Sequence, residues 1–295
     1  MSATAWRVGS LLMLIAFILV WGEIAALKLV SPVFLPTPLH AWNALVHGFA
    51  QSDLLAKLMG TIRHMIGGWL VASLLGVGIG ALVGSSRAAR DYIAPTLEFP
   101  RPLPASAVIP VAIAMFGLTP EMALGVIAFG SIWPALLAAI HGFGAVEPRL
   151  LEVQRALGLS RWAGIAKISL PSAAPDVLAG LRLGLTVSLI LAVVCEMIAG
   201  VDGLGQWVLL AARAYRSADV FAGVMLLGLI GVVANAVLSM HLISKGVSWA
   251  SLDQVVCALR FFYGVTLGCD AIPERIAYAR EPRKLPAVLS ADEVV

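Results

Sequence analysis

Residues 61–84 read TIRHMIGGWLVASLLGVGIGALVG, and after His64 this stretch holds no charged residue. A bilayer core about 30 Å thick is crossed by roughly 20 apolar residues in an α-helix, so the stretch is long enough to span a membrane. Small residues that recur at every fourth position let a second helix approach to backbone contact. The stretch therefore predicts a membrane helix with one closely packed face, formed by Gly68, Ala72, Gly76, Gly80 and Gly84.

The composition of the whole chain agrees with this prediction. Of 295 residues, 60% are hydrophobic and 13% are charged, whereas soluble domains carry about 25% charged residues. The net charge of +3 is small, and no basic run is interleaved with aromatic residues, so no nucleic-acid partner is expected. Three cysteines without metal-ligand spacing indicate neither a disulfide framework nor a metal site.

Apolar segments of membrane length recur along the chain, and the third is short and interrupted by prolines. With the N-terminus in the cytoplasm, the cytoplasmic segments carry most of the Arg and Lys residues, as membrane proteins prefer. We therefore expect an all-α integral membrane protein, multi-pass, with both termini cytoplasmic. It has about six spans, at residues 8–30, 61–84, 104–118, 122–143, 177–200 and 220–243.

The fifth span repeats the small-residue pattern and ends it on an acid. Gly180, Gly184, Ser188 and Ala192 are spaced by four, and the next step is Glu196. A carboxylate within a span is a candidate functional group, so we consider Ser188 and Glu196 as pathway residues. The alternative is that Glu196 lies near the outer interface, where it is hydrated or caps a neighbouring helix.

Prolines crowd the approach to the third span, at Pro100, Pro102, Pro104 and Pro110. Since proline removes an amide donor and clashes with the preceding turn, this helix must start late or bend. Irregular backbone at membrane depth is tolerated where it lines a wet cavity. Pro104 and Pro110 are therefore candidate walls of a pathway, and a kink needed only for packing is the alternative.

No catalytic or metal-binding constellation is evident. His40, His47, His64, His141 and His241 are scattered without an H-E-x-x-H pattern, so we expect interfacial or solvated histidines. Gly203 and Gly205 predict an extracytoplasmic turn.

A polar, partly basic segment separates the fourth and fifth spans. Residues 152–171 read EVQRALGLSRWAGIAKISLP, in which Gly158 suits a left-handed helix C-cap and Ser160 an N-cap. The pattern predicts two short cytoplasmic helices, the second stopped by Leu170-Pro171. Periodicity leaves open whether the pair docks on a protein or lies on the anionic inner leaflet.

The spacing of this segment resembles the EAA loop of the membrane subunits of bacterial ABC importers, E-A-A-x3-G-x9-I-x-L-P. Glu152, Gly158, Ile168 and Leu170-Pro171 match it, whereas Val153 and Gln154 replace two alanines. FLPTP at 34–38, RPLP before the third span, LGLSRW, GLRLGL, CEMIAG and GLG extend the similarity over about residues 33–244. They resemble the branch of the binding-protein-dependent transport family that imports nitrate, sulfonates, taurine, bicarbonate or pyrimidine precursors.

The resemblance implies a permease subunit of a bacterial inner membrane that is not itself an enzyme. Its partners would be cytoplasmic ATPase subunits, an extracytoplasmic solute-binding protein, a second permease chain in a homodimer or heterodimer, and membrane lipid. ATP and Mg would bind the partner ATPase, because this chain has no G-x4-G-K-[ST] motif. No cofactor is expected in this chain itself. An ion-coupled secondary transporter is the alternative. The expected ATPase-coupling residues are Glu152, Ala156, Gly158, Ile168, Leu170 and Pro171.

The expected organisation has three parts. Residues 1–60 hold the first span and an extracytoplasmic segment, and residues 61–244 hold the permease core with the EAA-like loop at 147–175. Residues 245–295 form a cytoplasmic tail that is atypical of the family.

Overall fold

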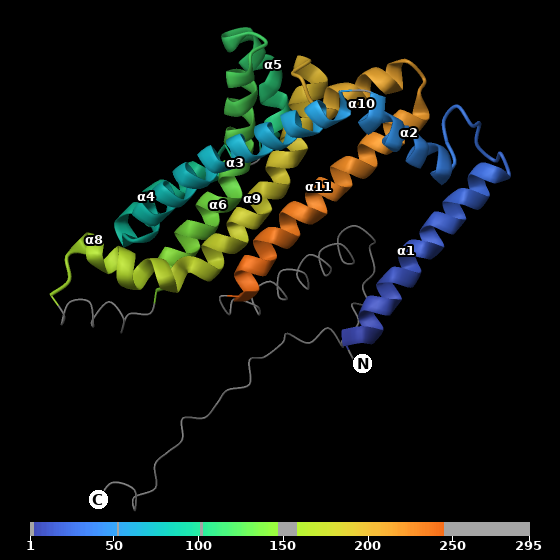
Figure 1. Ribbon diagram of the computed structural model, residues 1–295. Helices are drawn as coiled ribbons and strands as arrows, with labels where there is room; N and C mark the ends of the chain where they lie inside the picture. The colour runs from blue at the N-terminus through green and yellow to red at the C-terminus, as the bar shows by residue number, and fades with distance from the viewer. Residues whose placement is uncertain (1–2, 52, 101–102, 147–157, 245–295) are drawn as a thin grey trace, which may run out of the picture. The chain divides into compact units, whose positions relative to one another are not determined.

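The computed structural model describes residues 3–51, 53–100, 103–146 and 158–244 (Figure 1). Regular structure in these ranges is helical, without strands, which confirms the all-α prediction. Met1–Leu238 is one compact unit; of the second, Ser239–Val295, the described part is residues 239–244. The expected tail at 245–295 lies outside the described residues.

Long apolar helices account for four of the predicted spans. They are α3 (Leu54–Gly84), α6 (Pro120–Gly144), α9 (Leu170–Ala199) and α11 (Ser217–Ser244). The first and third predicted spans overlap α1 (Ala3–Ala26) and α5 (Ala105–Phe116). The apolar helical parts described for these two, Ile15–Ala26 and Ala105–Phe116, are shorter than the four long helices. The protein is therefore a multi-pass membrane protein.

Shorter helices connect these spans. They are α2 (Pro38–Gln51), α4 (Arg87–Glu98), α8 (Arg161–Gly164), a π-helical turn (Ile165–Ser169) and α10 (Leu204–Arg213).

Several predicted boundaries are displaced. Helix α3 begins about two turns before residue 61, at Leu54, whose side chain is fully buried. Helix α1 ends at Ala26 instead of Val30, and Lys28 beyond it has a left-handed φ of 52°. Helix α5 starts directly after Pro104 and ends at Phe116, and the next residue, Gly117, has a φ of 72° that favours glycine.

The centre of the bundle is the side-by-side packing of α3, α6 and α9 (Figure 1). Both small-residue faces lie against α6. A Cβ atom at Gly80 would lie 2.8 Å from the carbonyl oxygen of Leu136, and one at Gly180 would lie 2.6 Å from that of Pro134. Because a side chain at either position would meet backbone, the three helices are in backbone contact.

Side-chain contacts join α1 to α11 and to the loop that follows α1, and join α11 to α9. The rings of Trp21 and Phe221 stack with centroids 5.2 Å apart, and Trp21 Nε1 donates to the carbonyl oxygen of Pro36. Near its other end, α11 places Asn235 beside Arg182 of α9. Large apolar side chains of α1 and α11 are widely exposed, which suits contact with lipid or with another membrane subunit.

Candidate functional site

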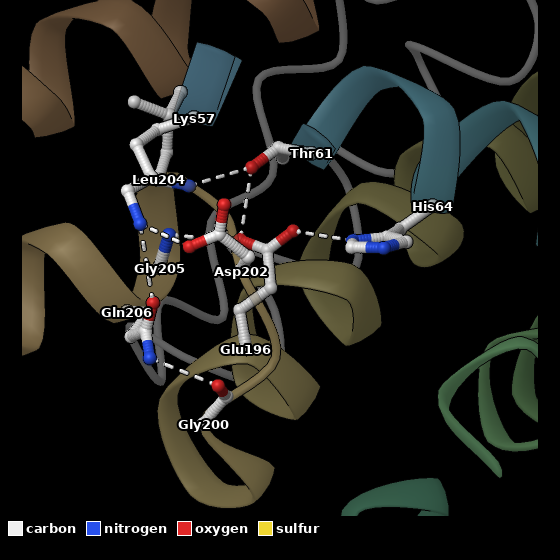
Figure 2. Close-up of polar contacts among 9 residues, drawn as sticks. All are labelled: Lys57, Thr61, His64, Glu196, Gly200, Asp202, Leu204, Gly205 and Gln206. Atoms are coloured by element: carbon white, nitrogen blue, oxygen red, sulfur yellow. Dashed lines mark hydrogen bonds and ion pairs between the residues drawn. The ribbon is translucent and has the colours of Figure 1, made fainter. Parts of the chain in front are cut away.

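Glu196, near the end of α9, is the most deeply buried acid among the described residues, with 1% of its surface exposed. Its Oε2 accepts hydrogen bonds from Thr61 Oγ1 at 2.9 Å and from the Gly205 amide at 2.8 Å. Its Oε1 lies 3.0 Å from His64 Nδ1. Figure 2 shows these groups converging on the carboxylate from α3 and α10. We call Thr61, His64, Glu196, Leu204 and Gly205 the carboxylate cluster.

Thr61 extends the cluster to the first residue of α10. Its hydroxyl accepts from the Leu204 amide at 2.8 Å while it donates to Glu196. The first amides of a helix have no partner within that helix, and its N-terminus favours negative charge. Thr61 of α3 and Glu196 of α9 therefore cap the N-terminus of α10.

The close approach of α10 to α9 depends on glycine. A Cβ atom at Gly203 would overlap the carboxyl group of Glu196, and one at Gly205 would lie 2.5 Å from the carbonyl oxygen of Val193. The expected turn at these glycines is thus the start of a helix pressed onto α9: Gly203 precedes α10 and Gly205 lies inside it.

A solvated rim surrounds the buried carboxylate. Lys57 forms an ion pair with Asp202, whose side chain is 70% exposed. Gln206 Nε2 donates to the carbonyl oxygen of Gly200, the left-handed residue that ends α9. Exposed ion pairs contribute little stability, so the buried bonds of the cluster dominate.

The arrangement is suited to holding helices together. An ionised carboxylate only accepts hydrogen bonds, so His64 Nδ1 carries the proton when Glu196 is ionised. In the described ranges, no group of three or more His, Cys, Asp or Glu side chains could hold a metal ion.

The structure corrects the expectation for one histidine. His64 is 9% exposed and contacts Glu196, so its side chain is buried within the protein and is not solvated. Its position follows from α3, which places residues 61 and 64 one turn apart on the same face. A His and a Thr one turn apart on a predicted membrane helix were the sequence feature that could have indicated a buried polar site, but their acidic partner is distant in sequence.

The other pathway candidates are not gathered with Glu196. Ser188 is fully buried and its Oγ donates to the carbonyl oxygen of Leu185 in the same helix. Pro104 precedes α5 and Pro110 lies within it, both with exposed side chains.

The expected coupling segment is described from Gly158 onward, so Glu152 and Ala156 lie outside the described residues. Gly158 has the expected left-handed conformation, with φ of 61°, and Ser160 Oγ accepts from the Ala163 amide. Trp162 is 74% exposed. The segment thus presents an apolar side chain outside the bundle.

Leu170-Pro171 does not end the second short helix, contrary to the prediction. Residues from Trp162 to Ala199 form one helical span of 38 residues, which includes Ile168. In the π-helical turn the Leu170 amide donates to the carbonyl oxygen of Ile165, one residue further back than in an α-helix. Pro171, which has no amide hydrogen, stands where this wider pattern changes to the α-helical one, so the helix continues through it.

Comparisons with known proteins identify the family. Residues 72–242 match the model of the family described as "Binding-protein-dependent transport system inner membrane component". "Putative aliphatic sulfonates transport permease protein SsuC" of Bacillus subtilis is 30% identical over 231 residues, 78% of this chain and 83% of the relative. "Taurine transport system permease protein TauC" of Escherichia coli is 30% identical over 216 residues, 72% of this chain and 78% of the relative.

The fold also has a counterpart among solved structures. "Crystal structure of an amino acid ABC transporter with histidines" matches with a TM-score of 0.51 at 19% identity, over 65% of this chain and 92% of that chain. The sulfonate and taurine relatives belong to the branch that the sequence motifs indicated. The chain therefore belongs to the family of binding-protein-dependent transport system inner membrane components, and is a non-catalytic permease subunit of an ABC transporter whose ATPase is a separate partner.

Proposed function

We propose that this chain imports a small anion of the sulfonate, taurine, nitrate or bicarbonate type, delivered by an extracytoplasmic binding protein. Two permease chains enclose the pathway within surrounding lipid, and both termini are cytoplasmic. ATP and Mg bind only the partner ATPase. The similarity to permeases named for aliphatic sulfonates and taurine supports this solute class.

The coupling element in this proposal is the segment 152–171. The observation that carries the proposal is the unbroken helix from Trp162 to Ala199. It joins an exposed segment of the EAA type to the carboxylate cluster near the other end of α9. Because a continuous helix transmits displacement along its axis, an ATPase that moves the segment would move α9 and the helices bonded to Glu196.

Gly158 provides a test of this coupling. Gly158→Pro cannot adopt a φ of 61°, since proline fixes φ near −65°, whereas Gly158→Asn can, because asparagine tolerates the left-handed region. In proteoliposomes with the partner ATPase and binding protein, Gly158→Pro should reduce solute uptake per ATP about tenfold while ATP is still hydrolysed, a loss within the usual range of allosteric coupling. Gly158→Asn should stay close to wild type.

Equal coupling in both variants would contradict the proposed role of the segment. Glu152→Lys, within the EAA-like pattern, should have the same uncoupling effect as Gly158→Pro. Uptake that persists without ATP under an ion gradient would instead favour the ion-coupled alternative. Competition of labelled taurine uptake by an alkyl sulfonate, nitrate and bicarbonate would identify the anion class.

A further inference from the structure

An apolar groove lies between α3, α9 and α11, apart from the carboxylate cluster. Its volume is about 430 Å³, and its lining is made entirely of apolar side chains. Leu58, Ile62 and Trp69 line it from α3, Leu185 from α9, and Ala234 and Leu238 from α11. The indole N–H of Trp69 is already used, because it donates to the carbonyl oxygen of Leu181. The groove therefore offers no hydrogen-bonding group to a polar solute along these walls.

The contacts of α9 give the direction of the groove. On α3, residues 61 and 64 meet Glu196 while Trp69 meets Leu181, so α3 and α9 are antiparallel. On α11, Gly231 lies near Leu189 and Asn235 lies near Arg182, so α11 is antiparallel to α9 as well. Trp69 and Leu238 consequently mark the same end of the groove, at the level of Leu181 to Leu185.

Arg182 stands at this end of the groove and has no acidic partner among the described residues. Its Nε donates to Asn235 Oδ1 at 3.2 Å, and no ion pair of the described part includes its guanidinium. Arg182 lies twelve residues after Leu170 in α9, about 18 Å along the helix, and about 26 Å before Ala199. With Ala199 at one boundary of a hydrocarbon layer about 30 Å thick, Arg182 lies close to the other boundary, on the side of the coupling segment.

We propose that this groove binds one acyl chain of an anionic phospholipid and that Arg182 binds its phosphate. Apolar side chains line the groove over about three turns of α3, from Leu58 to Trp69, so its length and chemistry match one extended acyl chain. An unpaired cation where an apolar groove reaches the boundary matches the headgroup of an anionic lipid.

The test uses Trp69, which lines the groove, as the reporter. The full chain is reconstituted in phosphatidylcholine vesicles with increasing mole fractions of phosphatidylglycerol whose chains are brominated, and tryptophan fluorescence is measured. The contribution of Trp69 is the difference from Trp69→Phe. Quenching by phosphatidylglycerol should saturate at low mole fraction, whereas brominated phosphatidylcholine should quench in proportion to its content.

Two variants separate the headgroup from the chain. Arg182→Gln should raise the mole fraction of phosphatidylglycerol for half-maximal quenching about fivefold or more, as expected for the loss of one basic contact, and Arg182→Lys should retain most of the preference. The matched control, Arg213→Gln, removes an exposed arginine from α10 and should change nothing. Ala234→Phe, which fills the groove and leaves Arg182 intact, should abolish saturable quenching.

Other outcomes would overturn the proposal. Identical curves for the two lipids, or a phosphatidylglycerol preference retained in Arg182→Gln, would show that Arg182 does not select an anionic headgroup. If neither lipid quenches Trp69, a protein segment occupies the groove. Because Ala234→Phe keeps the arginine, the proposal stays testable if Arg182→Gln fails to fold.

Discussion

Glu196 is a buried carboxylate in a membrane protein, and its surroundings explain how that burial is tolerated. Removing an ionised carboxyl group from water is costly unless hydrogen bonds replace the lost hydration. Thr61, the Gly205 amide and His64 supply such bonds from two other helices. The carboxylate therefore fixes the positions of α3, α9 and α10 relative to one another.

Removing the carboxyl group should be far more harmful than neutralising it. Glu196→Ala leaves Thr61, His64 and the Gly205 amide without their acceptor and should lower the free energy of unfolding by about 3–5 kcal/mol. Glu196→Gln keeps one acceptor oxygen, and its amide group can face His64 in the other tautomer, so its cost should be about 1–2 kcal/mol. Thermal unfolding of the purified full chain in detergent measures both.

Glu121 is the matched control, because it is exposed in the first turn of α6. Glu121→Ala should cost at most about 1 kcal/mol, the usual value of a charge at a helix N-terminus. Equal losses for Glu196→Ala and Glu196→Gln would mean that the charge itself, and not the hydrogen-bonding pattern, stabilises the cluster.

The sequence predicted part of this site and could not predict the rest. The spacing of four from Gly180 placed Glu196 on the packed face of its helix, and capping of a neighbour was one of the two alternatives considered for it. Its partners Thr61 and His64 are 135 and 132 residues away. Helical periodicity relates residues only within one helix, so it could not place them beside Glu196.

At the scale of the helices, the positions of the glycines within α3 determine which face meets α6. Gly80 and Gly78 are two residues apart but differ in surroundings. A Cβ atom at Gly80 would lie 2.8 Å from the carbonyl oxygen of Leu136, whereas one at Gly78 would have no neighbour within 4 Å. The packing of α3 against α6 should therefore depend on one glycine and not on the other.

Valine at each position tests this difference. Gly80→Val forces α3 and α6 apart and should cost about 3 kcal/mol or more, at or beyond the upper end of ordinary overpacking. Gly78→Val places the same side chain in open space and should change stability by less than about 1 kcal/mol. The amount of folded protein recovered from membranes and its thermal midpoint provide the measurement, and similar losses in both variants would contradict the packing described for α3.

Apolar length and periodicity predicted the positions of the long helices, but they did not predict the short helices α2, α4 and α10. Gly203 and Gly205 were expected to form a turn because glycines are typical of turns, whereas α10 begins there and its first amides donate to Thr61 and Glu196. The predicted stop at Pro171 was wrong for a related reason. Proline usually ends a helix, and the π-helical turn that accommodates it here has no sequence signal of its own.

At the scale of the whole molecule, α9 links the exposed segment at Trp162 to the carboxylate cluster. The helical span of 38 residues between Trp162 and Ala199 is about 57 Å long. If it acts as a rod, displacement at one end reaches α3 and α10 through Glu196. If it bends within the membrane, displacement is absorbed before it reaches them.

Ile190 is the position at which these two behaviours can be separated, because its side chain is exposed and makes little contribution to the core. Ile190→Pro removes one hydrogen bond of α9 and kinks the helix, at a cost of about 3 kcal/mol, whereas Ile190→Ala shortens the side chain and leaves the helix straight. In proteoliposomes with the partner ATPase and binding protein, Ile190→Pro should reduce uptake per ATP hydrolysed about fivefold or more, a loss of roughly 1 kcal/mol of coupling. ATP hydrolysis should continue, and Ile190→Ala should match wild type. Undiminished uptake by a folded Ile190→Pro variant would mean that the drive from the ATPase reaches the pathway through other helices, because a kinked α9 could not transmit it as a rod.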